Sequence, residues 1–211
     1  MFVSEVQKLV YLAPPRTAST TVLAQLVSEP FNAQTVSGCE HLLNVTTWHI
    51  DLDDYTTIIS VRHPYTRAIS LWRKLCISAI LPPVDRLTIF CRTIFAEGLP
   101  NFEGFLRHPN LQELLNTYWR CSWHQERVPK FIEHVIHSEK FMVDVENIPK
   151  LKGVVFSDKN VGPPMAQAWH SLYEQSPICL ELIQKLWLDD FVEFGYSLDF
   201  DQCKAGQMFV S

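Results

Sequence analysis

Hydroxyl and guanidinium groups gather near the start of the chain, where they could bind a phosphate or a sulfate. The run reads Pro14-Pro15-Arg16-Thr17-Ala18-Ser19-Thr20-Thr21. It stands between a short apolar stretch and a segment of helical spacing, so backbone N–H groups and the positive end of a helix dipole would face one point. Arg16 would add a fixed positive charge. The same residues would also suit an ordinary turn followed by a Ser/Thr helix cap.

This loop is not a Walker A loop. The pattern G-x-x-x-x-G-K-[ST] needs glycines, and none is present between Ala13 and Thr21. An ordinary ATPase or GTPase is therefore disfavoured.

A second candidate anion site follows later in the chain. It reads Val61-Arg62-His63-Pro64-Tyr65-Thr66-Arg67-Ala68-Ile69-Ser70. Arg62 would leave a strand at the edge of a sheet where ligands bind in open α/β folds, and Ser70 would lie in the second turn of the next helix. Arg62 and Ser70 could then meet on one anion. Arg67 would share the helical side of Ser70, and it would equally suit a solvated surface charge or an ion pair.

The elements around these two runs are short strands that alternate with helices. Leu9 to Ala13 has the apolar composition of a buried parallel strand, and Thr20 to Val27 has helical spacing. A second extended stretch covers Ala33 to Ser37, and the β-branched run Thr56 to Val61 is the clearest strand. From Tyr65 the period becomes helical. This alternation predicts an α/β fold with a P-loop-like central parallel β-sheet flanked by helices.

The second half of the chain is expected to be mostly helical. Val84 to Leu115 has helical character with interruptions, and Phe131 to Ile136 is predicted to be a late strand. A helix should run from about Ile178 to Phe194 and stop at Gly195.

Length and composition fit a single folded domain over residues 1–211. The chain has 211 residues, 47% hydrophobic and 19% charged, which is near the average for globular proteins and is enough for one core. The formal net charge is −5, so no general basic field is present to hold nucleic acid or an anionic membrane surface. Any bound anion must be held by a local site.

Cysteine usage and hydropathy indicate a cytoplasmic protein. The six cysteines are scattered through apparent core segments and make up too small a fraction for a disulfide scaffold. They are Cys39, Cys76, Cys91, Cys121, Cys179 and Cys203. No apolar run approaches the roughly 20 residues that span a bilayer, so we expect no membrane span.

Taken together, the two anion loops resemble those of a known enzyme family. The run from Pro15 to Thr20 resembles the 5′-phosphosulfate loop of sulfotransferases that use 3′-phosphoadenosine 5′-phosphosulfate (PAPS), and the run from Val61 to Ser70 resembles their 3′-phosphate motif. Asp190-Phe191-Val192-Glu193-Phe194-Gly195-Tyr196 is similar to the D-F-x-x-F-G-Y ending of the carbohydrate (Golgi-type) branch. The segment from Ile136 to Glu139, with Asp144, also resembles that branch. We expect a short, soluble version of it.

Three residues depart from the family pattern. The family usually has Lys at the position of Arg16, commonly Gly at Ala18 and often Asp at His63. Arginine keeps the positive charge but changes its geometry. Nucleotide binding is therefore a stronger expectation than turnover.

The resemblance implies transfer of a sulfuryl group from PAPS to an acceptor hydroxyl, with release of 3′,5′-ADP (PAP). It implies no metal. The expected donor-binding residues are Arg16, Thr17, Ala18, Ser19, Thr20, Thr21, Arg62, Ser70, Lys159 and Asn160. Arg16 would also stabilise the charge that grows on the leaving oxygen.

A catalytic base is needed to take the acceptor proton. We favour His41, whose ordinary pKa suits the task, and Glu40 is the rival. Neighbouring residues on an extended backbone point to opposite sides, so only one of the two should face the cleft.

Several alternatives stay open. The acceptor could be a glycan, a glycolipid or a small alcohol. The chain could instead be a nucleotide or small-molecule kinase with an atypical phosphate loop, or a non-catalytic PAPS- or PAP-binding protein.

The spacing of Cys121, His124, His134 and His137 is superficially zinc-like, but His134 and His137 would point to opposite faces of a strand. The oligomeric state is unknown.

Overall fold

A computed structural model describes residues 2–35, 52–77, 101–109, 111, 121, 132–156 and 169–210. The chain divides into two compact units: residues 1–63 with 118–163 form the first, and residues 64–117 with 164–211 form the second. A single domain over residues 1–211 stays a prediction. Most of the predicted helical stretch from 84 to 115 lies outside the described residues.

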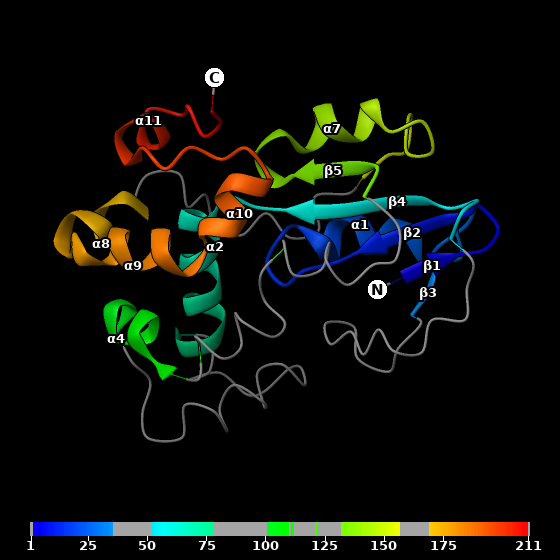
Figure 1. Ribbon diagram of the computed structural model, residues 1–211. Coiled ribbons are helices and arrows are strands. Elements are labelled where there is room, and N and C mark those ends of the chain that lie inside the picture. Colours follow the sequence, from blue (N-terminus) through cyan, green and yellow to red (C-terminus); the bar gives the residue numbers. More distant parts are fainter. Residues whose placement is uncertain are drawn as a thin grey trace. The chain divides into compact units, whose positions relative to one another are not determined.

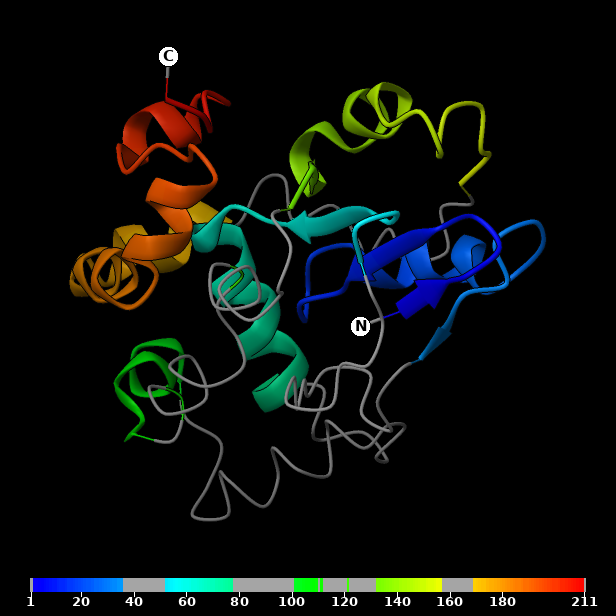
Figure 2. The same cartoon turned by 45° about the vertical axis from the view of Figure 1, so that its right-hand side comes forward.

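The first unit contains a sheet in the order β3-β1-β2-β4-β5 (Figure 1 and Figure 2). Its strands are β1 (Phe2–Ser4), β2 (Leu9–Leu12), β3 (Gln34–Thr35), β4 (Thr56–Val61) and β5 (His134–His137). Strands β2, β4 and β5 run parallel to their neighbours, whereas β1 is antiparallel to both β2 and β3. The fold is therefore a mixed α/β fold with a central sheet.

Strand β4 confirms the predicted strand Thr56 to Val61. Strand β2 confirms the predicted strand Leu9 to Ala13 except for its last residue. Strand β3 falls within the predicted stretch from 33 to 37. Strand β5 lies slightly later than expected. The sheet is mixed rather than wholly parallel because β1, which was not predicted from the sequence, is antiparallel to both of its neighbours. A strand of three residues is too short to show an alternating pattern, and it forms by pairing back onto β2 across a tight turn.

One apolar cluster holds the sheet to α1 (Ser19–Leu26) and α7 (Phe141–Asn147). Alternate residues of the strands face this cluster, as the two-residue period of a strand requires. Its members include Leu9, Tyr11, Ile58 and Ile136 from the strands with Val22, Leu26 and Val145 from the helices. All four residues of β2 are buried, so its two faces are both covered, as is usual for a central parallel strand.

The described part of the second unit is helical. Helix α2 (Pro64–Trp72) continues into a π-helical turn, η2 (Arg73–Ile77). The remaining helices are α4 (Phe102–Arg107), α8 (Trp169–Gln175), α9 (Ile178–Leu186), α10 (Leu188–Glu193) and α11 (Phe200–Lys204). None of the described helices is long and apolar enough to cross a membrane.

The predicted helix from 178 to 194 is present as two helices, α9 and α10, that break at Trp187. Hydrogen bonds continue across the break, because the Trp187 N–H donates to Ile183 and the Phe191 N–H donates to the Trp187 carbonyl. The stop at Gly195 is confirmed: its φ is 65°, in the left-handed region that glycine enters without a steric penalty.

Candidate functional site

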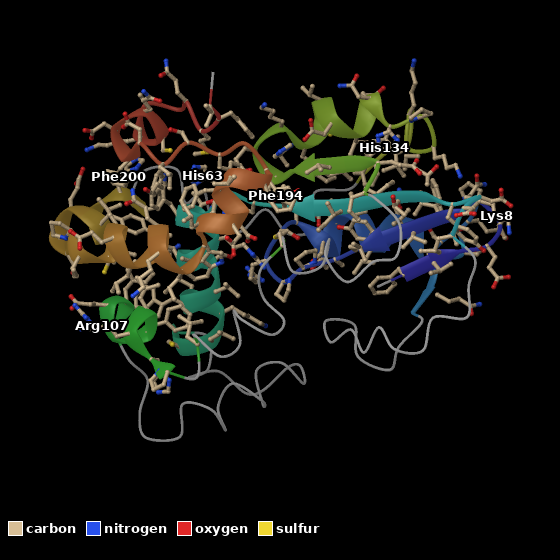
Figure 3. The ribbon with its side chains drawn as sticks, viewed as in Figure 1. Lys8, His63, Arg107, His134, Phe194 and Phe200 are labelled. Atoms are coloured by element: carbon tan, nitrogen blue, oxygen red, sulfur yellow. The ribbon has the colours of Figure 1, made fainter. Side chains whose placement is uncertain are left out.

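Three loops of the first unit leave the sheet at one edge. Parallel strands have their carboxyl ends on the same side, and the register pairs Leu12 with Ile59 and Val61 with His137. The loops that follow β2, β4 and β5 cover residues 13–18, 62–63 and 138–140. In Figure 3, His63 lies at the opposite end of the sheet from Lys8, which precedes β2. Both predicted anion loops are therefore on the carboxyl edge.

The loop after β2 has an unusual backbone. Arg16 has φ of 67° and Ala18 has φ of 60°, so two residues that are not glycine take left-handed conformations. Each such residue costs about 1–3 kcal/mol and persists only where the surroundings enforce it. Successive N–H groups in turns of this kind form concavities that bind anions. Ala18 is also the N-cap of α1, with no side-chain hydrogen bond at the cap.

Side-chain exposure in this loop separates two groups of residues. Arg16 and Thr20 are exposed, and Thr21 is half-buried. Ser19 and Thr17 are buried. The side chains of Arg16 and Thr20 are thus open to solvent.

Thr17 uses its hydroxyl to hold the loop in place. The Tyr11 hydroxyl donates to Ser60 Oγ at 2.7 Å, and Ser60 Oγ lies 2.7 Å from Thr17 Oγ1. Thr17 Oγ1 in turn donates to the Pro14 carbonyl at 2.7 Å. A hydroxyl has one hydrogen, so Ser60 must be the donor to Thr17. Burial raises the pKa of Tyr11 far above its ordinary value, so Tyr11 remains a donor.

This chain of buried hydroxyls joins β2, β4 and the loop between β2 and α1. This chain was not predicted from the sequence, and Thr17 was predicted only to bind PAPS. The alternation of β2 and β4 could have placed Tyr11 and Ser60 on one face, but their pairing needs the register of the sheet. What Thr17 can offer a ligand is its backbone rather than its hydroxyl.

The loop after β4 is held on both sides of Arg62. Ser138 Oγ donates to the Val61 carbonyl at 3.0 Å, and the His63 N–H donates to Glu139 Oε1 at 3.0 Å. The peptide groups before and after Arg62 are therefore fixed by two consecutive residues that follow β5. Arg62 itself is half-buried and His63 is fully buried. This contact gives a structural role to the segment around Glu139 that the sequence resemblance included.

A histidine and a carboxylate hold the loop after β5. His137 Nδ1 lies 2.8 Å from Asp144 Oδ2, and the His137 N–H donates to the same oxygen at 2.7 Å. Each side chain is 17% exposed. Asp144 lies on α7, so this pair ties the turn that carries Ser138 and Glu139 to a helix. The pair was not predicted from the sequence.

In the second unit, Arg67 is an internal residue. Its Nη1 lies 3.0 Å from Asp190 Oδ2, and the two side chains are 0% and 2% exposed. Of the roles that the sequence left open for Arg67, the ion pair is confirmed. The pair joins α2 to the first residue of the D-F-x-x-F-G-Y motif. Ser70 is buried on the same helix.

Four predicted site residues lie outside the described residues: Glu40, His41, Lys159 and Asn160. His124 of the zinc-like set lies outside them too, and His134 and His137 stand at the two ends of β5, three residues apart and so on opposite faces. Within the described part of the chain, no group of three or more His, Cys, Asp or Glu side chains could hold a metal ion.

Comparison of the sequence with known protein families gives a match. A model of the sulfotransferase family matches residues 1–197, which is nearly the whole chain. The protein therefore belongs to the sulfotransferase family, and sulfotransfer is its class of activity. No curated protein and no solved structure gives a significant match.

Proposed function

We propose that the protein transfers a sulfuryl group from PAPS to an acceptor hydroxyl and releases 3′,5′-ADP. Family membership supports sulfotransfer, and the likeness of the two loops to donor-binding motifs supports PAPS as the donor. The observation that carries the proposal is the loop after β2. It combines exposed Arg16, two left-handed residues and the start of α1, and it stands on the carboxyl edge beside the end of β4.

In the proposed reaction the acceptor oxygen attacks the sulfur atom. The bond between sulfur and the 5′-phosphate oxygen breaks, and its electron pair stays on that oxygen. Arg16 and the backbone N–H groups at the start of α1 stabilise the charge that develops there. His41, or Glu40 in its place, takes the acceptor proton. Catalysis then depends mainly on alignment and on charge stabilisation.

The donor-binding roles follow the two loops. We assign the 5′-phosphosulfate to Arg16, Ser19, Thr20, Thr21 and the backbone of Thr17 and Ala18. We assign the 3′-phosphate to Arg62 and Ser70. Lys159 and Asn160 are proposed as further contacts to the nucleotide.

The acceptor we propose is neutral: a glycan, a glycolipid or a small alcohol. The net charge of −5 would oppose the approach of a dense polyanion at long range.

We also propose a cytoplasmic location. Cys76, Cys121, Cys179 and Cys203 are all buried within apolar surroundings rather than gathered into a disulfide scaffold, which suits a reducing compartment.

Transfer of labelled sulfate from PAPS to a panel of acceptors tests the function. We expect at least one acceptor to be labelled, and 3′,5′-ADP to raise the melting temperature more than ATP with Mg²⁺ does. Stabilisation by ATP only with Mg²⁺ would favour a kinase. Tight binding of 3′,5′-ADP without any labelled acceptor would favour a non-catalytic binding protein.

Paired substitutions test the choice of base. His41→Ala should lower the rate of transfer and leave the affinity for 3′,5′-ADP unchanged, because the base acts on the acceptor. Glu40→Ala serves as the matched comparison. If Glu40→Ala lowers the rate and His41→Ala does not, Glu40 is the base.

A further inference from the structure

The C-terminal segment, residues 198–210, follows the part of the chain that the family model matches. Its far end folds back on the F-G-Y motif. The Ser197 N–H donates to the Met208 carbonyl and the Val210 N–H donates to the Gly195 carbonyl, both at 3.0 Å. The rings of Phe209 and Tyr196 stack with centroids 5.2 Å apart. The segment is thus anchored at its end.

Its near end contacts Tyr65, the second residue of α2. The Tyr65 hydroxyl donates to the Leu198 carbonyl at 2.8 Å. Gln184 Nε2 donates to the same hydroxyl at 2.8 Å and to the Leu198 carbonyl at 3.0 Å. Burial raises the pKa of Tyr65 to about 12, so this hydroxyl stays protonated at neutral pH.

Phe200, labelled in Figure 3, packs against the rings of Tyr65 and Tyr173. Its ring meets the Tyr65 ring edge-on, with centroids 5.8 Å apart and planes at 89°. It also lies 5.5 Å from the ring of Tyr173, whose hydroxyl donates to the Tyr65 carbonyl at 2.6 Å. One side chain of the C-terminal segment therefore supports the side chain and the backbone of the first turn of α2.

We propose that the C-terminal segment positions the 3′-phosphate half of the donor site, with Phe200 as the positioning residue. The inference rests on the proposed function, which assigns Ser70 to the 3′-phosphate. Ser70 follows Tyr65 by five residues on one helix, about 7.5 Å along its axis at the usual rise. A short helix is nearly rigid because of its backbone hydrogen bonds, so fixing its first turn also limits where the Ser70 backbone and Cβ can lie.

Isothermal titration of the full chain with 3′,5′-ADP and with 5′-AMP tests the proposal. The two ligands differ only in the 3′-phosphate. Phe200→Ala should weaken 3′,5′-ADP by roughly tenfold and change 5′-AMP by less than about twofold, the tenfold loss being about 1.4 kcal/mol. Phe200→Tyr, which keeps the ring, should restore the preference for 3′,5′-ADP.

Phe209→Ala is the matched control. Phe209 is another half-buried aromatic residue of the same segment, and it stacks on Tyr196 rather than on Tyr65. This variant should lose stability and keep the ratio of the two affinities. Equal weakening of both nucleotides by Phe200→Ala, or an unchanged ratio, would overturn the positioning role and show a purely structural one.

Two further results keep the test decisive. If Phe200→Ala does not fold, Tyr65→Phe removes the hydrogen bond to Leu198 and keeps the ring, and it should weaken 3′,5′-ADP selectively by about threefold; an unchanged ratio overturns the proposal. If the unmodified protein binds 3′,5′-ADP no more tightly than 5′-AMP, the proposed 3′-phosphate site is itself wrong, and the positioning role falls with it.

Discussion

At the scale of single residues, the loop after β2 departs most from what its sequence prefers. Ala18 takes a left-handed conformation at the point where the related family commonly has glycine. Alanine has a Cβ that resists this conformation, and glycine does not. The loop therefore keeps a glycine-like backbone without the glycine.

The first prediction concerns this strain. Ala18→Gly should raise the free energy of unfolding by about 0.5–1 kcal/mol, because relief of the left-handed strain exceeds the extra backbone entropy of glycine in the unfolded chain. Ala24→Gly, within α1, is the matched control and should lower it by about 1 kcal/mol. Urea unfolding measures both. A loss at position 18 equal to that at position 24 would contradict the strained conformation.

The second prediction concerns Arg62. Arg62→Ala should weaken 3′,5′-ADP by about 1.5–3 kcal/mol, the range for a hydrogen bond to a charged group. Arg107→Ala is the control, since Arg107 is an exposed arginine that pairs with Glu103 at 2.9 Å on α4. Titration calorimetry gives both affinities. An unchanged affinity for Arg62→Ala would remove this residue from the site.

At the scale of elements, polar contacts between segments distant in the sequence hold parts of the candidate site in place. The turn after β5 holds the end of β4 through Ser138 and Glu139. α2 is joined to α10 through Arg67 and Asp190. These contacts are directional, so they set orientation where apolar packing alone would allow sliding.

The third prediction tests the contact after β5. Glu139→Ala removes the acceptor of the His63 N–H and should lower the affinity for 3′,5′-ADP, because the backbone beside Arg62 loses its support. An unsatisfied buried N–H costs about 1–3 kcal/mol. Glu139→Gln keeps an acceptor oxygen, so its affinity for 3′,5′-ADP should lie between that of the unmodified protein and that of Glu139→Ala. Glu146→Ala, at an exposed position of α7, should have no effect in the same titration, and an equal loss there would refute the contact's role.

The fourth prediction tests the buried ion pair. Arg67→Met and Asp190→Leu should each lower the free energy of unfolding by about 3–5 kcal/mol, because each leaves one buried charge without its partner. The double variant should lose much less than the sum of the two. A double-mutant cycle in urea measures the coupling. Additive losses would mean that the two groups are not coupled energetically.

At the scale of the whole molecule, buried groups that titrate in alkali set the upper pH limit of stability. Burial raises the pKa of Cys76 to about 12 and that of Cys203 to about 11. In the unfolded chain such thiols ionise near pH 8.5. Above that pH the unfolded state therefore binds fewer protons than the folded state, and the free energy of unfolding must fall as pH rises.

The fifth prediction follows from this sign. Stability should be insensitive to these thiols below about pH 8 and should fall steadily from about pH 9 to the folded pKa values of 11–12. Cys76→Val should make the free energy of unfolding fall less steeply with pH, because the folded and unfolded states would then differ by up to one proton fewer. Urea unfolding at several pH values in the presence of a reductant measures the slope. A constant free energy of unfolding up to pH 10.5 would contradict the prediction.

Several elements follow from local sequence alone. The β-branched run Thr56 to Val61 is β4, the helical period after the Ser/Thr run is α1, and Gly195 ends α10. That Arg16 and Arg62 each lie between a strand and the helix that follows it also agrees with the local alternation of strand-like and helical patterns. In each case the determining interactions lie within a few residues of one another along the chain.

Other features are decided only by the tertiary structure. The hydroxyl of Thr17 lies 2.7 Å from that of Ser60, 43 residues away. Arg67 meets Asp190 across 123 residues, and His63 meets Glu139 across 76. A side chain's partner depends on which elements pack together and in what register, and that depends on the free energy of the whole folded chain rather than on any local pattern.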